Sequence, residues 1–175
     1  MAFDPRTDRL PFSDLDASKE VQAGSPEPSH DARIRHLQRV PLFSGFTEDD
    51  LRRIAQLSRI SEVPAGTTVT QIGEPGDSFF ILIDGTVAVR TPIGLGSELR
   101  PGDFFGEMSL LDGEPRSATI VATTDLRLLI VDRSDFWRLL EETPDLFRRM
   151  LTILSRRVRR LEQALHALRY GLNPT

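Results

Sequence analysis

The sequence predicts a mainly β fold with flanking α helices, and two observations lead to this prediction. Residues 60–131 hold short runs rich in Val, Ile, Thr and Phe, broken by turn residues at intervals of roughly 8–12 residues, a spacing typical of sandwiches and barrels. The segments on both sides of this region show helical periodicity instead. With 175 residues, of which 39% are hydrophobic, the chain is long enough for one domain with a hydrophobic core.

The N-terminal part divides into a tail and a helical segment. Residues 1–30 are rich in Asp, Ser and Pro and show no sustained periodicity, so we expect a disordered or loosely packed acidic tail. Residues 31–58 are expected to form N-terminal helices. One of these helices begins after Thr47, because Asp50 follows three residues later and the two side chains come close to a capping box.

Residues 59–132 are predicted to form the β core. Its strands are separated by turn sequences rich in Gly, Pro and Asp, at residues 64–66, 73–77, 84–85, 94–96, 101–103 and 112–113. The Asp84-Gly85 dipeptide lies between two apolar segments, residues 79–83 and 86–90. This arrangement is a strong signal for a β-hairpin, so the two segments are expected to pair with each other.

Residues 133–170 are expected to form C-terminal lid and dimerisation helices, one from Arg133 to Glu142 and another that starts at Pro144 and stops at Gly171. In the second helix, apolar residues alternate at spacings of four and three: Phe147, Leu151, Leu154, Val158, Leu161, Leu165 and Leu168. This coiled-coil pattern predicts a parallel homodimer through residues 147–168, with Arg157 of one chain beside Glu162 of the other. The alternative is a helix that packs only on the β core of its own chain.

Composition excludes several classes of function. The chain has no cysteine, which excludes disulfides, thiol nucleophiles and iron–sulfur clusters. The histidines are His30, His36 and His166, all outside the β region, so a metal site or a histidine base inside the core is not expected. We therefore predict no enzyme activity, no metal and no cofactor. The N-terminus lacks the features of a signal peptide and the apolar runs are short, which favours a cytoplasmic protein without membrane contact.

Charge gives little reason to expect binding to nucleic acid, because the net charge is −4. The last helix does carry a group of arginines beside its apolar positions: Arg148, Arg149, Arg156, Arg157, Arg159 and Arg160. No aromatic residues are interleaved with them and no helix-turn-helix follows. We interpret these arginines as solvated flanks of a coiled coil rather than as a DNA-binding face.

Residues 104–119 carry the chemistry. Gly106 follows two phenylalanines and allows a sharp turn, after which residues 107–111 are long enough for a single helical turn. Arg116 is expected to open the next strand nine residues after Glu107. A guanidinium fits two phosphate oxygens and a carboxylate accepts a hydroxyl, so this pair suits a sugar phosphate.

This stretch closely resembles the phosphate-binding cassette of cyclic nucleotide-binding domains, whose pattern is approximately F-G-E-x-[AS]-L, a short turn, and P-R-[SA]-A-[ST]. The matching residues are Phe105, Gly106, Glu107, Ser109, Leu110, Pro115, Arg116, Ser117, Ala118 and Thr119. The resemblance covers about residues 40–168 and extends to bacterial catabolite-activator-type regulators, protein kinase A regulatory subunits and cyclic nucleotide-gated channels. It implies a double-stranded β-helix (a jelly-roll or β-roll) with short N-terminal helices and a long C-terminal helix.

The resemblance also implies a role for each residue of the site. Glu107 would accept the ribose 2′-hydroxyl, and Arg116 would pair with the cyclic phosphate. Ser117 would donate to a phosphate oxygen, and Arg157 on the last helix would meet the base. The complete set of expected ligand-binding residues is Phe105, Gly106, Glu107, Met108, Ser109, Arg116, Ser117, Ala118 and Arg157.

The function implied by this resemblance is that of a sensor. It would bind a cyclic nucleotide, cAMP in preference to cGMP, and relay binding through the C-terminal helix to an unidentified protein partner. The family's adenine-reading hydroxyl pair falls at Leu161 and Glu162, which cannot perform that role. Two alternatives stay open: the sensor half of a transcription regulator without its DNA-binding domain, since the chain ends at Thr175, and a ligand-free module in which Glu107 and Arg116 bridge each other.

Overall fold

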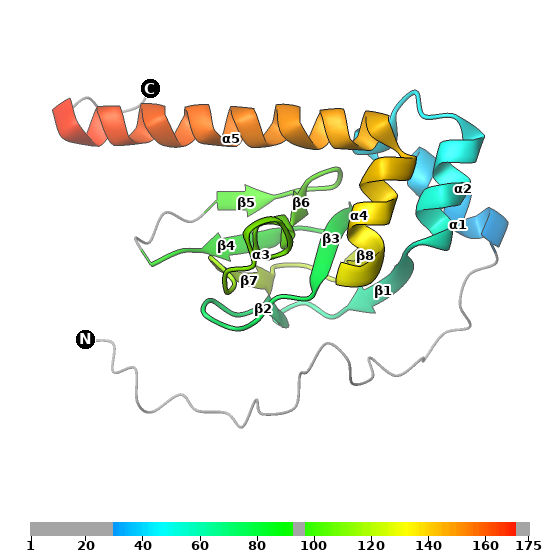
Figure 1. Cartoon of the computed structure of the whole chain (residues 1–175). Helices are drawn as coiled ribbons and strands as arrows, with labels where there is room; N and C mark the ends of the chain where they lie inside the picture. The colour runs from blue at the N-terminus through cyan, green and yellow to red at the C-terminus, as the bar shows by residue number, and fades with distance from the viewer. Residues whose placement is uncertain (1–29, 93–96, 171–175) are drawn as a thin grey trace.

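The computed structural model describes residues 30–92 and 97–170 (Figure 1). The predicted tail, apart from residue 30, the expected turn at 94–96 and the expected helix stop at Gly171 lie outside these residues. The chain begins with helix α1 (His30–Gln38), the short 3-10 helix η1 (Pro41–Phe43) and helix α2 (Glu48–Gln56). Strands follow in the order β1 (Arg59–Val63), β2 (Thr68–Thr70), β3 (Ser78–Asp84), β4 (Val87–Arg90), β5 (Ser97–Leu99) and β6 (Phe104–Phe105). Helix α3 (Glu107–Asp112), strands β7 (Thr119–Ala122) and β8 (Leu126–Asp132), and helices α4 (Arg133–Glu142) and α5 (Pro144–Tyr170) complete the order.

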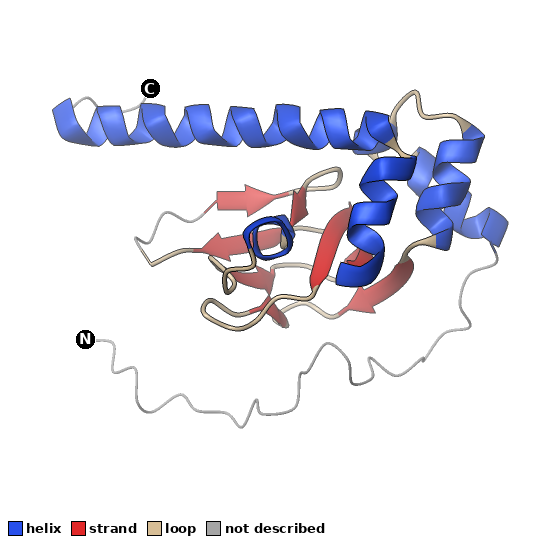
Figure 2. Cartoon of the chain, in the orientation of Figure 1, coloured by secondary structure: helices blue, strands red, loops and turns tan. Residues whose placement is uncertain are grey.

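The strands form two four-stranded antiparallel sheets with the orders β1-β8-β3-β6 and β2-β7-β4-β5. Figure 2 shows these sheets with helices α1, α2 and α4 gathered at one end of the molecule and the long α5 running along one side. The mainly β, jelly-roll architecture with N-terminal helices and a long C-terminal helix is therefore confirmed. The capping box that begins α2 is also present, with Asp50 N donating to Thr47 Oγ1 at 3.2 Å.

The hairpin expected at Asp84-Gly85 is wrong. Strand β3 pairs with β6 and β8, whereas β4 pairs with β5 and β7, so this turn carries the chain from one sheet to the other. Gly85 has a φ of +84°, and a Cβ there would lie 2.3 Å from the carbonyl oxygen of Asp125. A turn is present at these residues, as predicted, but the strand pairing differs because it depends on distant strands rather than on the turn itself.

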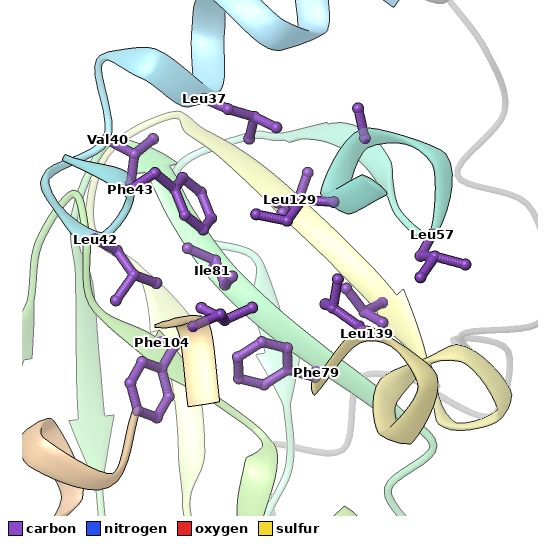
Figure 3. Close-up of a cluster of buried hydrophobic side chains, with 14 of the residues drawn as sticks. Leu37, Val40, Leu42, Phe43, Leu57, Phe79, Ile81, Phe104, Leu129 and Leu139 are labelled. Carbon is purple, nitrogen blue, oxygen red and sulfur yellow. The ribbon is translucent and has the colours of Figure 1, made fainter. Parts of the chain in front are cut away.

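Strands β3 and β8 are buried on both faces, and alternate residues enter two different cores. Phe79 and Ile81 pack with the helices, in a cluster that includes Phe43, Leu129 and Leu139 (Figure 3). Their neighbours pack between the two sheets, in a cluster formed by Phe80, Leu82, Val87, Phe105, Ile120, Ala122, Leu126, Leu128 and Ile130. The period of two along each strand therefore fixes the helices on one face of the sheet and the second sheet on the other.

Helix α5 has two different sides. Near its start Leu146 and Met150 are buried in the core, and Arg149 donates to the carbonyl oxygens of Leu42 and Ser44 beside η1. The other side carries an apolar stripe whose exposed fractions run from 42% to 70%, formed by Phe147, Leu151, Val158, Leu161, Leu165 and Leu168. Leu154, the remaining residue of the predicted pattern, is half-buried. In Figure 1 the far end of α5 continues beyond β5. The β core of the same chain therefore leaves the stripe uncovered.

Candidate functional site

The segment singled out by the sequence forms a turn and a short helix at the end of β6. Phe104 and Phe105 face opposite cores, and Phe105 stacks on Phe80 with ring centres 4.9 Å apart. Gly106 follows with a φ of +84° and is the N-cap of α3, a conformation that glycine adopts without strain. The helical turn predicted after Gly106 is confirmed as Glu107–Asp112. Two buried aromatic rings thus fix the point from which the helix starts.

Arg116 lies before a strand rather than at its first position. Strand β7 begins at Thr119, three residues later than expected, because the backbone of Arg116 is bonded to the loop between β2 and β3 instead. Arg116 N donates to the Glu74 carbonyl at 2.8 Å, and Gly73 N donates to the Arg116 carbonyl at 2.8 Å. The loop at residues 73–77, predicted only as a turn, therefore holds the backbone from which this side chain projects.

The guanidinium of Arg116 is held by backbone carbonyls. Nη1 donates to Gly106 O and Nη2 donates to Ser78 O, both at 2.9 Å, and the residue is 8% exposed. A Cβ on Gly76 would lie 2.6 Å from Arg116 Cζ, and a Cβ on Gly106 would lie 2.8 Å from Nη1. These two glycines form the walls of a narrow space that we call the arginine slot. Any larger residue in either wall would displace the guanidinium.

The arginine slot leaves Arg116 with free donors and no ion pair. A guanidinium has five N–H donors, and the two carbonyls use two of them. No carboxylate in the described part of the chain lies within ion-pair distance of it. Burial lowers the pKa of Arg116, and the charge of Asp77 opposes this, but a guanidinium stays protonated in proteins. The site therefore presents a buried cation with unused donors.

Glu107 is the other buried charge of the site. Its side chain is 4% exposed, and Oε1 lies 3.5 Å from Nη1 of Arg157 on α5. Burial raises the pKa of Glu107, while the charges of Arg157 and Arg116 and a backbone hydrogen bond act in the opposite direction. Glu107 and Arg116 are thus close enough to influence each other's charge, but each has different bonding partners. The direct bridge between them, considered as an alternative above, is not formed.

Arg157 connects α5 to this site. Its Nη2 donates to the carbonyl oxygen of Phe104 at 2.6 Å, and its guanidinium lies 4.5 Å from the centre of the Phe104 ring. Since its Nη1 also contacts Glu107, one side chain of α5 reaches the last strand before α3 and the first residue of α3.

Comparison with known proteins decides the family. Residues 60–143, which contain the turn, α3 and Arg116, match the family model described as "Cyclic nucleotide-binding domain". The chain carries a cyclic nucleotide-binding domain. Domains of this family are regulatory and non-enzymatic, so the prediction of a sensor rather than an enzyme is confirmed.

Three relatives illustrate the similarity. The cyclic nucleotide-gated potassium channel mll3241 of Mesorhizobium japonicum is 45% identical over 107 residues, which are 61% of this chain and 30% of the channel. The crystal structure of the Thermus thermophilus catabolite activator protein superposes with a TM-score of 0.65 at 31% identity, covering 74% of this chain and 63% of that one. The structure of PKAR CBD2 bound to Sp-2Cl-cAMPS gives 0.63 at 29% identity, covering 85% and 98%.

The curated relatives are longer proteins. The chain spans 30% of the channel and 28% of the cAMP-dependent protein kinase regulatory subunit of Aspergillus fumigatus that it matches. Within the described residues, no helix is both long enough and apolar enough to cross a membrane.

The remaining predicted residues lie around the same segment, residues 104–119, which we call the cassette. Met108 is exposed and its sulfur accepts from Ser117 Oγ at 3.4 Å, whereas Ser109, also in α3, is fully buried. Ala118 is half-buried against the core between the sheets, and its carbonyl accepts from Thr70 Oγ1 at 3.4 Å. The structure thus brings the predicted residues together in one region, from β6 through α3 to the residues before β7.

Sequence reasoning missed the partners that surround Arg116. Gly76 and Ser78 precede Arg116 by about 40 positions, and only the glycine-rich composition of residues 73–77 marked that loop. A separate hollow of about 430 Å³ lies at the opposite end of β3, beside Glu62, Asp84 and Asp125, and shares no residue with the cassette. In residues 30–92 and 97–170 no group of three or more His, Cys, Asp or Glu side chains is placed to hold a metal ion.

Proposed function

We propose that this domain binds cAMP in preference to cGMP, with Arg116 on the cyclic phosphate and Glu107 on the ribose. The observation that carries the proposal is the buried, unpaired guanidinium of Arg116 with donors to spare. A buried charge without a counter-ion is unfavourable, and a phosphate placed on the free donors removes that cost. The buried carboxylate of Glu107, close enough for the charges of the two residues to influence each other, supplies an acceptor for a ribose hydroxyl.

The other predicted residues complete the proposed binding mode. Ser117 is exposed beside Arg116, where its hydroxyl can donate to a phosphate oxygen. Gly106 and Ala118 offer backbone amides near the phosphate, while Phe105, Met108 and Ser109 shape the cassette. Arg157 faces this region from α5. The preference for cAMP is supported by relatives whose descriptions name cAMP, including the solved complex with a cAMP analogue. The residues at the family's two adenine-reading positions, Leu161 and Glu162, do not contribute to this support because neither carries a hydroxyl.

Thermal shift and calorimetry with cAMP, cGMP and AMP test the binding proposal. A ligand at 100 times its Kd stabilises the folded state by about 2.7 kcal/mol, roughly 5–10 °C for a chain of this size. We expect a shift with cAMP, a smaller one with cGMP and none with AMP, whose phosphate is not cyclic. Arg116→Lys keeps the positive charge but loses the planar guanidinium, which can donate two parallel hydrogen bonds. This change should weaken cAMP binding at least tenfold, a loss of about 1.4 kcal/mol in binding free energy.

The matched control is Arg100→Lys, the same change at an exposed residue whose side chain forms an ion pair with Glu98. It should leave the affinity unchanged. Equal shifts with AMP and cAMP, or an Arg116→Lys variant with unchanged affinity, would contradict the binding mode. No shift with either cyclic nucleotide would contradict the proposed function itself and favour a ligand-free module, in which Arg157 already satisfies Glu107.

The second part of the proposal concerns the output. We infer that nucleotide binding is relayed through α5, since Arg157 on this helix contacts Glu107, and that the exposed apolar stripe pairs with a second copy in a parallel homodimer. A downstream protein partner would then read the state of the helix pair. Similarity to the Thermus catabolite activator protein also supports the sensor half of a transcription regulator as an alternative context.

A further inference from the structure

Arg133 forms hydrogen bonds to residues around Arg116 but has no role in the binding mode proposed above. It is the first residue of α4, and the sequence marked it only as a helix start. Its Nε donates to Asp77 Oδ1 at 3.1 Å, and its Nη2 donates to the carbonyl oxygens of Gly76 at 2.8 Å and Ser109 at 3.2 Å. Its backbone N–H donates to the carbonyl of Asp77 at 2.7 Å. One residue therefore joins the β2–β3 loop, α3 and α4.

Two of these acceptors belong to the surroundings of Arg116. Gly76 is one wall of the arginine slot, and its missing Cβ would lie 2.8 Å from the Cβ of Ser109 as well as 2.6 Å from Arg116 Cζ. Ser109 is a fully buried residue of α3. A single terminal nitrogen of Arg133 thus bonds to both elements that close around the guanidinium of Arg116.

The charge of Arg133 acts on the same place. Arg133 and Arg116 are near enough for the charge of Arg133 to lower the pKa of Arg116, while Asp77, which pairs with Arg133, acts in the opposite direction. Two guanidiniums close together repel each other and attract an anion. The positive charge of Arg116, which has no carboxylate partner in the described residues, is therefore suited to a negatively charged phosphate of a ligand.

We propose that Arg133 is a positioning residue of the phosphate site, which keeps Gly76 and α3 closed around Arg116 so that the free donors stay directed at the phosphate. The inference rests on the proposed function for its ligand. The side chain of Arg133 is 44% exposed and lies outside the hydrophobic core, so its substitution removes no core packing. Its effect should appear in nucleotide affinity and in the local stability of α3.

The test compares Arg133→Gln and Arg133→Lys with Arg138→Gln, which removes the same charge from the same helix at an exposed residue that pairs with Glu142. Calorimetry with cAMP should show an affinity about tenfold lower for Arg133→Gln, the size expected for losing charge-assisted hydrogen bonds. Arg133→Lys should be affected less, because lysine keeps the charge but not the fork. Arg138→Gln should bind as the wild type does.

Two further readouts separate positioning from a general loss of stability. In the Arg116→Lys background, the same Arg133→Gln change should cost little more, because the group that it positions is already altered. Without ligand, hydrogen exchange at residues 107–112 should be faster in Arg133→Gln and unchanged in Arg138→Gln. An affinity within twofold of wild type, equal losses in both backgrounds, or unchanged exchange would overturn the inference. If the wild type binds neither cAMP nor cGMP, the proposed function fails, and the exchange comparison still decides whether Arg133 holds α3.

Discussion

Glu107 shows what the site costs at the scale of a single residue. Its carboxylate is almost completely removed from water, and its contact with Arg157 is long, at 3.5 Å. Burial raises the pKa of Glu107, which means that the folded protein would be more stable if this group were neutral. A buried charge that lowers stability is expected where a ligand uses it.

The direction of the shift predicts how Glu107→Gln behaves. The unfolded chain titrates near the ordinary value of 4.5 and the folded chain at a higher pH, so the folded state holds the extra proton between the two values. The contribution of Glu107 to stability is thus greatest below 4.5 and is lost as the pH rises through the raised pKa. Relative to wild type, the Gln variant should become more stable as the pH increases from 4 to 7, as measured by urea unfolding without ligand.

Binding should change in the opposite sense to stability. Glu107→Gln replaces a charged acceptor by a neutral one, and we expect about tenfold weaker binding of cAMP. For 2′-deoxy-cAMP, which lacks the hydroxyl, the two proteins should bind alike. A Gln variant that loses equal affinity for both ligands would place Glu107 somewhere other than at the ribose.

At the scale of elements, α5 has a side that contacts its own domain and a side that is exposed. Its buried side is anchored at Arg149 and again at Arg157, whereas the apolar stripe faces away from the core. The stripe repeats every seven residues, the spacing that favours a two-stranded coiled coil, and it includes large side chains that are at least 42% exposed. These features support a second copy as the partner of the stripe.

The dimer proposal predicts different effects for two neighbouring positions. Leu161→Glu places a charge in the stripe and should convert dimers to monomers in sedimentation analysis, with the melting temperature of the β core little changed. Gln163→Glu adds the same charge two residues later, outside the stripe, and should leave the dimer intact. A wild type that stays monomeric at all concentrations, or equal effects of the two changes, would contradict a dimer through this helix.

The elements also show which features a sequence can predict. The cap of α2, the turn of α3 and the period of α5 depend on residues within a few positions of one another, and all three are recovered from the sequence. The sheet change after Asp84 depends on β4–β7 pairs such as Val87 with Ala122, 35 positions apart, and the Gly76 wall lies 40 positions before Arg116. Gly76 reads as an ordinary turn glycine, because its contact with Arg116 exists only after the two sheets have formed.

At the scale of the whole molecule, the site and the stripe meet in one residue. Arg157 contacts Glu107 within its own chain, and in a parallel dimer the same side chain would lie beside Glu162 of a second copy. Arg149 fixes the start of α5 to η1, so any displacement of the helix is expected beyond that anchor. In the proposed binding mode a ribose hydroxyl on Glu107 would compete with Arg157, and we propose that Arg157, instead of meeting the base, would then pair across the dimer.

This competition predicts that nucleotide binding strengthens the dimer. Two pairs between Arg157 and Glu162, at roughly 0.5 kcal/mol each, correspond to a dimer about fivefold tighter. By linkage, dimerisation should raise the affinity of each of the two nucleotide sites by the square root of that factor, about twofold. Arg157→Gln should abolish the coupling, whereas Arg156→Gln, at an exposed residue with no partner in the described part of the chain, should preserve it.

Sedimentation with and without saturating cAMP measures the change in the dimerisation constant, and hydrogen exchange over residues 147–168 shows where in α5 the change occurs. Identical protection of α5 with and without cAMP would contradict the relay and show that the effect of binding is confined to the cassette. A ligand shifts an equilibrium between two conformations only if it binds them with different affinities.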